Sequence, residues 1–288
     1  MKVLVKKLNA FTNSLKGGNP AGVLLDSPHL TDKKMAHISE ILNVSETAFV
    51  YPSKDADYKI RFFTPTIEVD LCGHATIATF YLLAIENRLS KQYLHQETRA
   101  GILPIRIEYG PNKEVDKVLM SQAKANIKDI HLDIYNIADS MNISVEDIDN
   151  RIPFKAVSTG LFTLPICVKG YDILKEMKPN FEMIKKICEK NGIGSYHVFS
   201  FETLEEGSVY HARNFAPYYS INEDPVTGTA NGAICSFLLK YKFIKGEKFI
   251  CEQGDIIGRP GRVFVDIKDE NVMVGGVARV VEERKIEI

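Results

Sequence analysis

Two short segments place glycine and small polar residues at the start of an uncharged run. They are GHAT at 73–76 and GTAN at 228–231. If each begins a helix, its first N–H groups have no partner within the helix, and the helix dipole adds partial positive charge there. Glycine also lets a ligand approach the backbone closely. We therefore expect the N–H groups of Gly73, Gly228 and Thr229 to bind an anion, most simply the carboxylate of a small substrate.

A structural reading of the same segments is open. Asp224-Pro225 before the second segment is an ordinary helix start, with Asp as the cap and Pro in the first turn. The small residues could then serve tight packing of the helix start. The occurrence of one pattern in both halves of the chain favours the functional reading.

Glu46 and His74 could exchange protons, although each has an ordinary alternative. Glu46 lies in NVSETAFV, where a glutamate is usually a solvated loop residue or a partner for Ser45. A lone histidine is more often structural, and a helix N-terminus should lower the pKa of His74 and keep it neutral. Asp70, four residues before His74, is expected to cap the loop rather than to act in catalysis.

The chain contains an internal repeat that must position these residues. The segment 61–83 and the segment 212–239 both run from an aromatic strand through Pro, an acidic loop and Gly into a small-residue helix. The helices expected at 75–85 and 229–239 are almost without charge and apolar on every face, so each must be buried on all sides. At about eleven residues they are too short to cross a membrane. A duplicated domain follows.

Most other segments are short β-type runs, which predicts two curved sheets, each wound around one central helix. The predicted fold class is α+β, with two pseudo-symmetric halves. We place the first half at 1–117 plus 279–288, the second at 118–278, and the active site in the cleft between them. Exposed amphipathic helices are expected at about 32–42, 145–149 and 180–190.

Composition excludes several classes of function. The chain has 288 residues, a net charge of −1 and 45% hydrophobic residues, so no nucleic-acid surface is expected. The N-terminus does not have the pattern of a signal peptide, and no run is long enough for a membrane span, which favours a cytoplasmic protein. Five cysteines without a CxxC pair indicate free buried thiols, and the histidine spacing predicts no metal site.

Six ordered motifs resemble the PhzF-like family of phenazine biosynthesis, which shares the diaminopimelate epimerase fold. They are GNPAGV, SETAFV, TP followed after five residues by LCGHAT, NFAP followed after six by DPVTGTAN, EQGDIIGRPG and VGGVARVV. The resemblance spans nearly the whole chain. It implies two halves, each a barrel-like sheet around a central helix, and it implies a homodimer.

The resemblance also implies roles for named residues. Glu46 would be the general acid/base of a cofactor-independent isomerase acting on a small carboxylate metabolite, with a pKa raised by a poorly hydrated cleft. His74 and Asp224 would orient the substrate and relay protons. Related epimerases use two cysteines, and Cys72 matches only the first of them, so we expect it to be a buried small residue.

Two alternatives remain. An amino or hydroxy acid racemase or epimerase would need a second acid or thiol facing Glu46 across one carbon. A non-catalytic metabolite-binding protein would leave Glu46 exposed and far from the helix starts.

Overall fold

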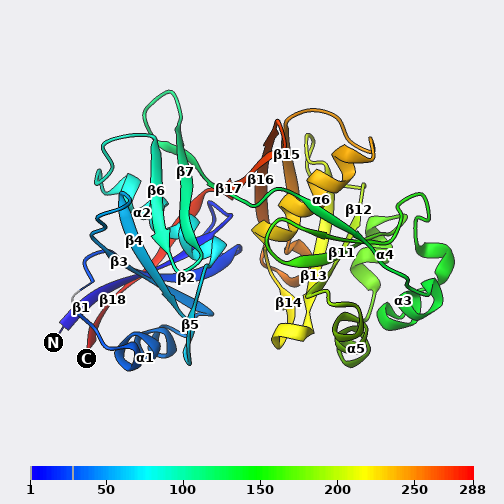
Figure 1. Ribbon diagram of the computed structural model, residues 1–288, viewed down its shortest axis with the longest axis horizontal. Coiled ribbons are helices and arrows are strands. Elements are labelled where there is room, and N and C mark those ends of the chain that lie inside the picture. The colour runs from blue at the N-terminus through cyan, green and yellow to red at the C-terminus, as the bar shows by residue number, and fades with distance from the viewer. Residues whose placement is uncertain (1, 28) are drawn as a thin grey trace. The chain divides into compact units, whose positions relative to one another are not determined.

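The computed structural model describes residues 2–27 and 29–288 of the chain. The chain divides into two compact units (Figure 1). One runs to Ser121 and also includes Gly275–Ile288, and the other is Gln122–Val274. Each unit is described by itself.

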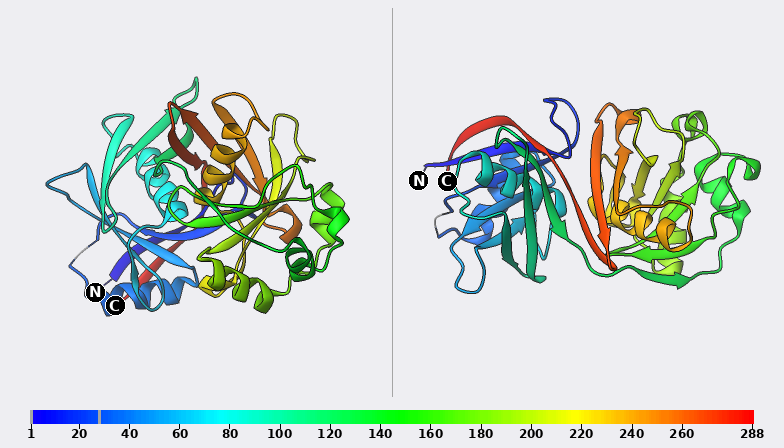
Figure 2. Two further views of the ribbon diagram at one scale, coloured as in Figure 1. Left: turned by 45° about the vertical axis from the view of Figure 1, so that its right-hand side comes forward. Right: turned by 90° about the horizontal axis from the view of Figure 1, so that it is seen from above.

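The first unit is one curved sheet with two helices. In the sheet order β18–β1–β2–β3–β4–β6–β7–β8, neighbouring strands are hydrogen-bonded. The last strand of the chain thereby pairs with the first, and the two termini lie side by side in the first unit (Figure 2). The strands are β1 (Lys2–Ala10), β2 (Asn19–Leu24), β3 (Glu46–Tyr51), β4 (Tyr58–Phe63), β5 (Glu68–Val69, beside β4), β6 (Tyr93–Thr98), β7 (Gly101–Tyr109), β8 (Val115–Ser121) and β18 (Ala278–Glu287).

Helix α2 (Gly73–Ile85) is the centre of this unit. It packs against β1, β2, β3, β8 and β18, so strands surround it, and its residues from Ala75 to Phe80 are all buried. Helix α1 (Asp32–Leu42) is amphipathic and lies on the outside of the sheet, where its buried face joins a core that contains Phe49 and Phe63. The expected buried helix and the expected exposed helix are both present.

The second unit repeats this arrangement. Its sheet order is β9–β10–β11–β12–β13–β15–β16, and helix α6 (Gly228–Lys240) packs against β10, β11 and β16. The remaining helices are α3 (Ile134–Met141), α4 (Tyr171–Glu176), α5 (Phe181–Asn191) and the short η2 (Pro217–Tyr219) and η3 (Asp255–Ile257). The strands are β9 (Asn126–Asp129), β10 (Lys155–Ser158), β11 (Phe162–Cys167), β12 (Ser195–Ser200), β13 (Tyr210–Ala216), β14 (Ile221–Asp224), β15 (Lys248–Gln253), β16 (Gly261–Lys268) and β17 (Asn271–Gly276).

Strand directions confirm the duplication. From β1 to β7 the successive pairings are antiparallel, parallel, antiparallel, parallel and antiparallel. From β10 to β16 the same sequence of pairings recurs, with α6 in the place of α2. The predicted α+β fold with two related halves is therefore confirmed.

The prediction of an amphipathic helix at 145–149 is wrong. The structure has only a single 3-10 turn, η1 (Val145–Asp147). The Asp147 side chain accepts from the Ser144 N–H at 2.9 Å and closes the turn. Ile148 is then extended and forms a bridge with Val168. Helices α3 and α4, of eight and six residues, were not predicted.

All five cysteines are buried and free, as expected. Within the described residues, none of the helices combines the length and the apolar character that crossing a bilayer requires.

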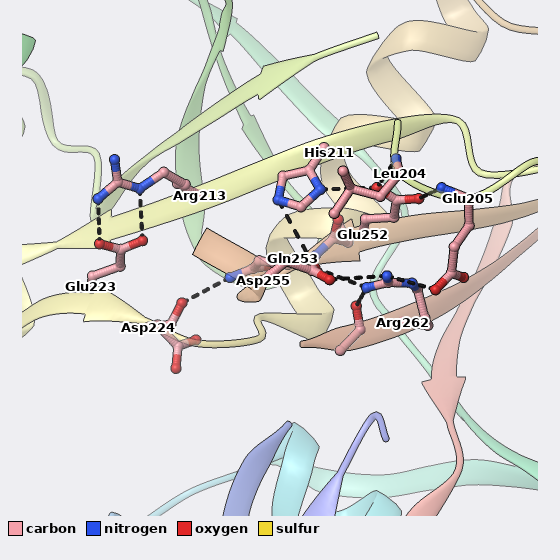
Figure 3. Close-up of polar contacts among 12 residues, drawn as sticks. Leu204, Glu205, His211, Arg213, Glu223, Asp224, Glu252, Gln253, Asp255 and Arg262 are labelled. Atoms are coloured by element: carbon pink, nitrogen blue, oxygen red, sulfur yellow. Dashed lines mark hydrogen bonds and ion pairs between the residues drawn. The ribbon is translucent and has the colours of Figure 1, made fainter. Parts of the chain in front are cut away.

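Glu252 is expected to stabilise the second unit strongly at neutral pH. Its buried carboxylate accepts from the N–H groups of Leu204 (2.8 Å) and Glu205 (2.7 Å) and contacts His211 Nδ1 at 2.9 Å (Figure 3). Burial acts to raise its pKa, but His211 and the two N–H groups hold the pKa at about 2, below the ordinary 4.5. This stabilisation is complete above about pH 4.5 and is lost as the pH falls toward about 2. The shift corresponds to roughly 3 kcal/mol.

Urea unfolding of Glu252→Gln at pH 7 should show a loss of about that size. Glu97 provides the control: it is the fifth residue of β6 as Glu252 is the fifth residue of β15, but it lies near the surface and pairs with Lys59. Glu97→Gln should lose less than about 1 kcal/mol. Equal losses in the two variants would contradict the special role of the buried carboxylate.

Candidate active site

Glu46, His74, Cys72 and Ser45 form one cluster in the first unit. Glu46 Oε2 lies 3.2 Å from His74 Nε2, and Ser45 Oγ lies 3.3 Å from the same nitrogen. The Cys72 sulfur is 3.5 Å from His74 Nδ1. The side chains of His74 and Glu46 are only 13% and 19% exposed. The structure therefore brings together two of the predicted catalytic residues.

Local structure explains how these side chains meet. Glu46 is the first residue of β3, which pairs in parallel with β2. His74 is the second residue of α2, and Cys72 is its extended N-cap. The Cys72 carbonyl accepts from both the N–H (3.0 Å) and the hydroxyl (2.8 Å) of Thr76. These hydrogen bonds fix the start of α2, and Glu46, at the start of β3, lies beside it.

The directions of the two pKa shifts are opposite to those expected from the sequence. Burial acts to raise the pKa of Glu46, but His74, with smaller contributions from Ser45 and Cys72, holds it below its ordinary value. Burial alone would lower the pKa of His74, yet contacts with the Cys72 sulfur and the Glu46 carboxylate raise it well above its ordinary value. The expected neutral histidine and the expected raised glutamate pKa are both wrong, because the two groups form an ion pair.

One atom of this pair is left without a well-aligned partner. Glu46 Oε2 is buried and receives no hydrogen bond of good geometry from the described residues. Its interaction with His74 is therefore one of charge rather than of a directed bond. A carboxylate oxygen in this state can accept a proton from a third group.

The same cluster offers a set of metal ligands. One atom each from Glu46, Cys72 and His74 lies within 4.8 Å of the others, and these are ligand types that zinc uses. A metal would require the Cys72 thiolate. Burial raises the pKa of Cys72, which opposes formation of that thiolate.

A second cluster lies at the start of α6 in the second unit. Asp224 ends β14, and its carboxylate accepts a short hydrogen bond from the hydroxyl of Thr227, the N-cap of α6. Gly228 and Thr229 are the first two residues of the helix. The Thr229 carbonyl accepts from Thr159 Oγ1 at 3.0 Å. Asp224, Gly228 and Thr229 thus lie together, as the sequence pattern predicts.

The two central helices differ at their N-termini from α1, α3 and α5, and share with the short helix α4 the lack of a capping side chain. The cap side chains of α1, α3 and α5 each accept a bond from their own helix; they are Thr31, Asp133 and Asn180. Cys72 and Thr227 make no such bond at the starts of α2 and α6. The first N–H groups of the central helices are therefore not capped by these side chains, which is the condition that anion binding needs.

Several features of the two clusters were not predicted from the sequence. Cys72 is buried as expected, but it also contacts His74. The hydrogen bond between Thr227 and Asp224 was not predicted, and neither were the hydrogen bonds of Gln253 to these two residues. The only signal for Gln253 was its place in EQGDIIGRPG. Asp70 is exposed and pairs with Arg99 at 3.2 Å, so it takes no part in the first cluster.

Comparison with known proteins defines the family. The phenazine biosynthesis-like protein family (PhzC-PhzF) matches residues 8–284. An uncharacterized isomerase of Clostridium acetobutylicum is 37% identical over 273 residues, which cover 91% of this chain and 89% of that protein.

Solved structures agree with this match. A PhzF-family phenazine biosynthesis protein of Bacillus anthracis is 35% identical with a TM-score of 0.91, and all of both chains is covered. A hydroxyproline epimerase of Agrobacterium vitis shares the fold at 12% identity, with a TM-score of 0.61 over 99% of this chain and 92% of that one. The chain is therefore an isomerase that belongs to the phenazine biosynthesis-like family.

Proposed function

We propose that the chain is a cofactor-independent isomerase that moves a proton within a small carboxylate metabolite. The contact of 3.2 Å between Glu46 and His74 is the observation that carries the proposal. Glu46 Oε2 removes a proton from an acidified carbon and returns it to another carbon, so the product has the composition of the substrate. The positive charge on His74 keeps Glu46 ionised until the proton arrives and then steadies the charge that develops on the substrate.

Substrate binding is assigned to the starts of the central helices. The N–H groups of Gly73, Gly228 and Thr229 hold the carboxylate and the developing enolate charge, and Asp224 orients a substrate amine or hydroxyl. The absence of side-chain caps on both helices supports this assignment.

Deuterium wash-in is the direct test. The protein is incubated in deuterated water with a panel of small amino, hydroxy and cyclohexadiene carboxylates, with and without EDTA, and the products are followed by NMR and mass spectrometry. Incorporation of deuterium at a carbon, unchanged by EDTA, supports the proposal and names the substrate class. Activity that EDTA removes and zinc restores would replace it with a metal-dependent reaction at Glu46, Cys72 and His74.

The same spectra separate isomerisation from racemisation. Deuterium at a new carbon with a moved double bond indicates isomerisation, whereas deuterium at one carbon with inverted configuration indicates a racemase or epimerase. The repeat disfavours a two-thiol racemase, because the N-cap residue of α6 is Thr227 where that of α2 is Cys72. Cys235 instead contacts Cys251 in the core at 3.4 Å.

Replacing Asp224 with asparagine should lower kcat/KM in this assay about 10²-fold. The substitution removes the charge that orients the substrate but keeps an oxygen for the Thr227 hydroxyl. Asp70→Asn is the matched control, since Asp70 precedes the other central helix but pairs with Arg99 at the surface. Equal activity of Asp224→Asn and wild type would remove Asp224 from the site.

A cytoplasmic location and a homodimer are part of the proposal and remain predictions. Cell fractionation and light scattering of the purified chain test them.

A further inference from the structure

The side chain of Gln253 is completely engaged in hydrogen bonds at the start of α6. It ends strand β15 and is buried. Its Nε2 donates to the Asp224 carbonyl at 2.9 Å and to Thr227 Oγ1 at 3.1 Å. Its Oε1 accepts from the Thr227 N–H at 3.1 Å and from Asn231 Nδ2 at 2.9 Å. Both hydrogens of the amide and both lone pairs of its oxygen are used.

The partners allow only one orientation of this amide. The Asp224 carbonyl can only accept and the Thr227 N–H can only donate, so Nε2 must face the first and Oε1 the second. Asn231 is fixed in the same way, because its Nδ2 donates to the Thr227 carbonyl at 2.9 Å and its Oδ1 accepts from Tyr210 at 2.8 Å. A reversed Gln253 amide would bring donor against donor at the Thr227 N–H, and a reversed Asn231 amide would bring acceptor against acceptor at the Thr227 carbonyl.

This orientation determines what the Thr227 hydroxyl does. Its oxygen accepts from Gln253, so its own hydrogen is available for the Asp224 carboxylate, to which it donates. Gln253 therefore holds Asp224 twice, directly through the backbone carbonyl and indirectly through Thr227. It also occupies the Thr227 N–H, so that donor is not one of the N–H groups that the proposed function assigns to the substrate.

The residue after Gln253, Gly254, also packs closely against the turn before α6. Gly254 has a φ of +91°, and a Cβ there would lie 2.7 Å from the Pro225 carbonyl oxygen and 2.2 Å from that of Arg259. Only glycine permits this approach. On the opposite face of β15, Glu252 is anchored by Leu204, Glu205 and His211 (Figure 3). The strand that carries Gln253 is thus itself held in place.

From these contacts we infer that Gln253 is a positioning residue, which sets the place of the Asp224 carboxylate and of the first N–H groups of α6. The inference rests on the proposed function for its catalytic consequence. The positioning of Asp224 by Gln253 does not depend on the proposed function. Two independent measurements test the positioning and its catalytic consequence separately.

The first measurement is amide hydrogen exchange in Gln253→Met, which removes all four bonds with little change in volume. The Thr227 amide should exchange at least about tenfold faster than in wild type, because a buried donor loses its acceptor. Thr163→Val is the control: it removes a buried hydroxyl that bonds Ser195 in the same unit. It should leave the Thr227 amide unchanged. Unchanged exchange in Gln253→Met would overturn the inference, whatever the protein catalyses.

The second measurement is a double-mutant cycle on deuterium wash-in. Gln253→Met should lower kcat/KM at least about tenfold, and Thr163→Val should stay within about twofold of wild type. In an Asp224→Asn background, Gln253→Met should lower kcat/KM much less than it does in wild type, because its effect acts through Asp224. Additive losses, or equal losses in Gln253→Met and Thr163→Val, would show a merely structural role. A wild-type protein without activity would count against the proposed function, and the exchange of the Thr227 amide would still decide whether Gln253 fixes the turn.

Discussion

Replacing Glu46 with glutamine is expected to lower the rate of deuterium wash-in by about 10³-fold or more. Glutamine keeps the size and an oxygen of the side chain but cannot take a proton from carbon. The position of Oε2, buried and 3.2 Å from His74, makes Glu46 the carboxylate best placed to be the base of the first cluster. Single-turnover measurements on wild type and Glu46→Gln, with the same substrate for both, would give the rate of deuterium wash-in.

Glu97→Gln is the matched control for this experiment. Glu97 belongs to the same unit, is 23% exposed and pairs with Lys59. Its described contacts are with Lys59 and Ser53 and do not include His74. The control should keep full activity. Equal exchange by wild type and Glu46→Gln would transfer the role of the base to Cys72, His74 or Asp224.

Replacing His74 with asparagine is expected to lower kcat/KM about 10²-fold near pH 7 and to change its pH profile. In wild type His74 holds the pKa of Glu46 below its ordinary value, against the effect of burial. Without the imidazolium the effect of burial remains, so the pKa of Glu46 should rise. The acid limb of the profile, which reports protonation of Glu46, should therefore move to higher pH.

A histidine–glutamate pair at the surface provides the control for His74. His37 lies 3.2 Å from Glu40 on α1, and both side chains are more than half exposed. His37→Asn should change neither the rate nor the profile. An acid limb that stays in place in His74→Asn would show that the two groups do not titrate together in the active enzyme.

Much of this architecture is already determined by local sequence. A run without charge from Ala75 to Ile85 predicts a buried helix, and its recurrence at 229–239 predicts a second half of the same kind. Gly73 and Gly228 likewise predict helix starts with open N–H groups. These inferences succeed because hydrophobic pattern and helix-start chemistry depend on residues close together in the chain.

Only the tertiary structure decided the contacts between distant segments. Glu46 and His74 are separated by 28 positions, which no spacing rule connects, and the direction of each pKa shift depends on burial and charge acting against each other. Gln253 reaches back to Asp224 from another strand. The sequence by itself thus determined the repeat and the chemical types at the helix starts. Packing decided which side chains meet there and in which protonation state, because those depend on the three-dimensional surroundings of each group.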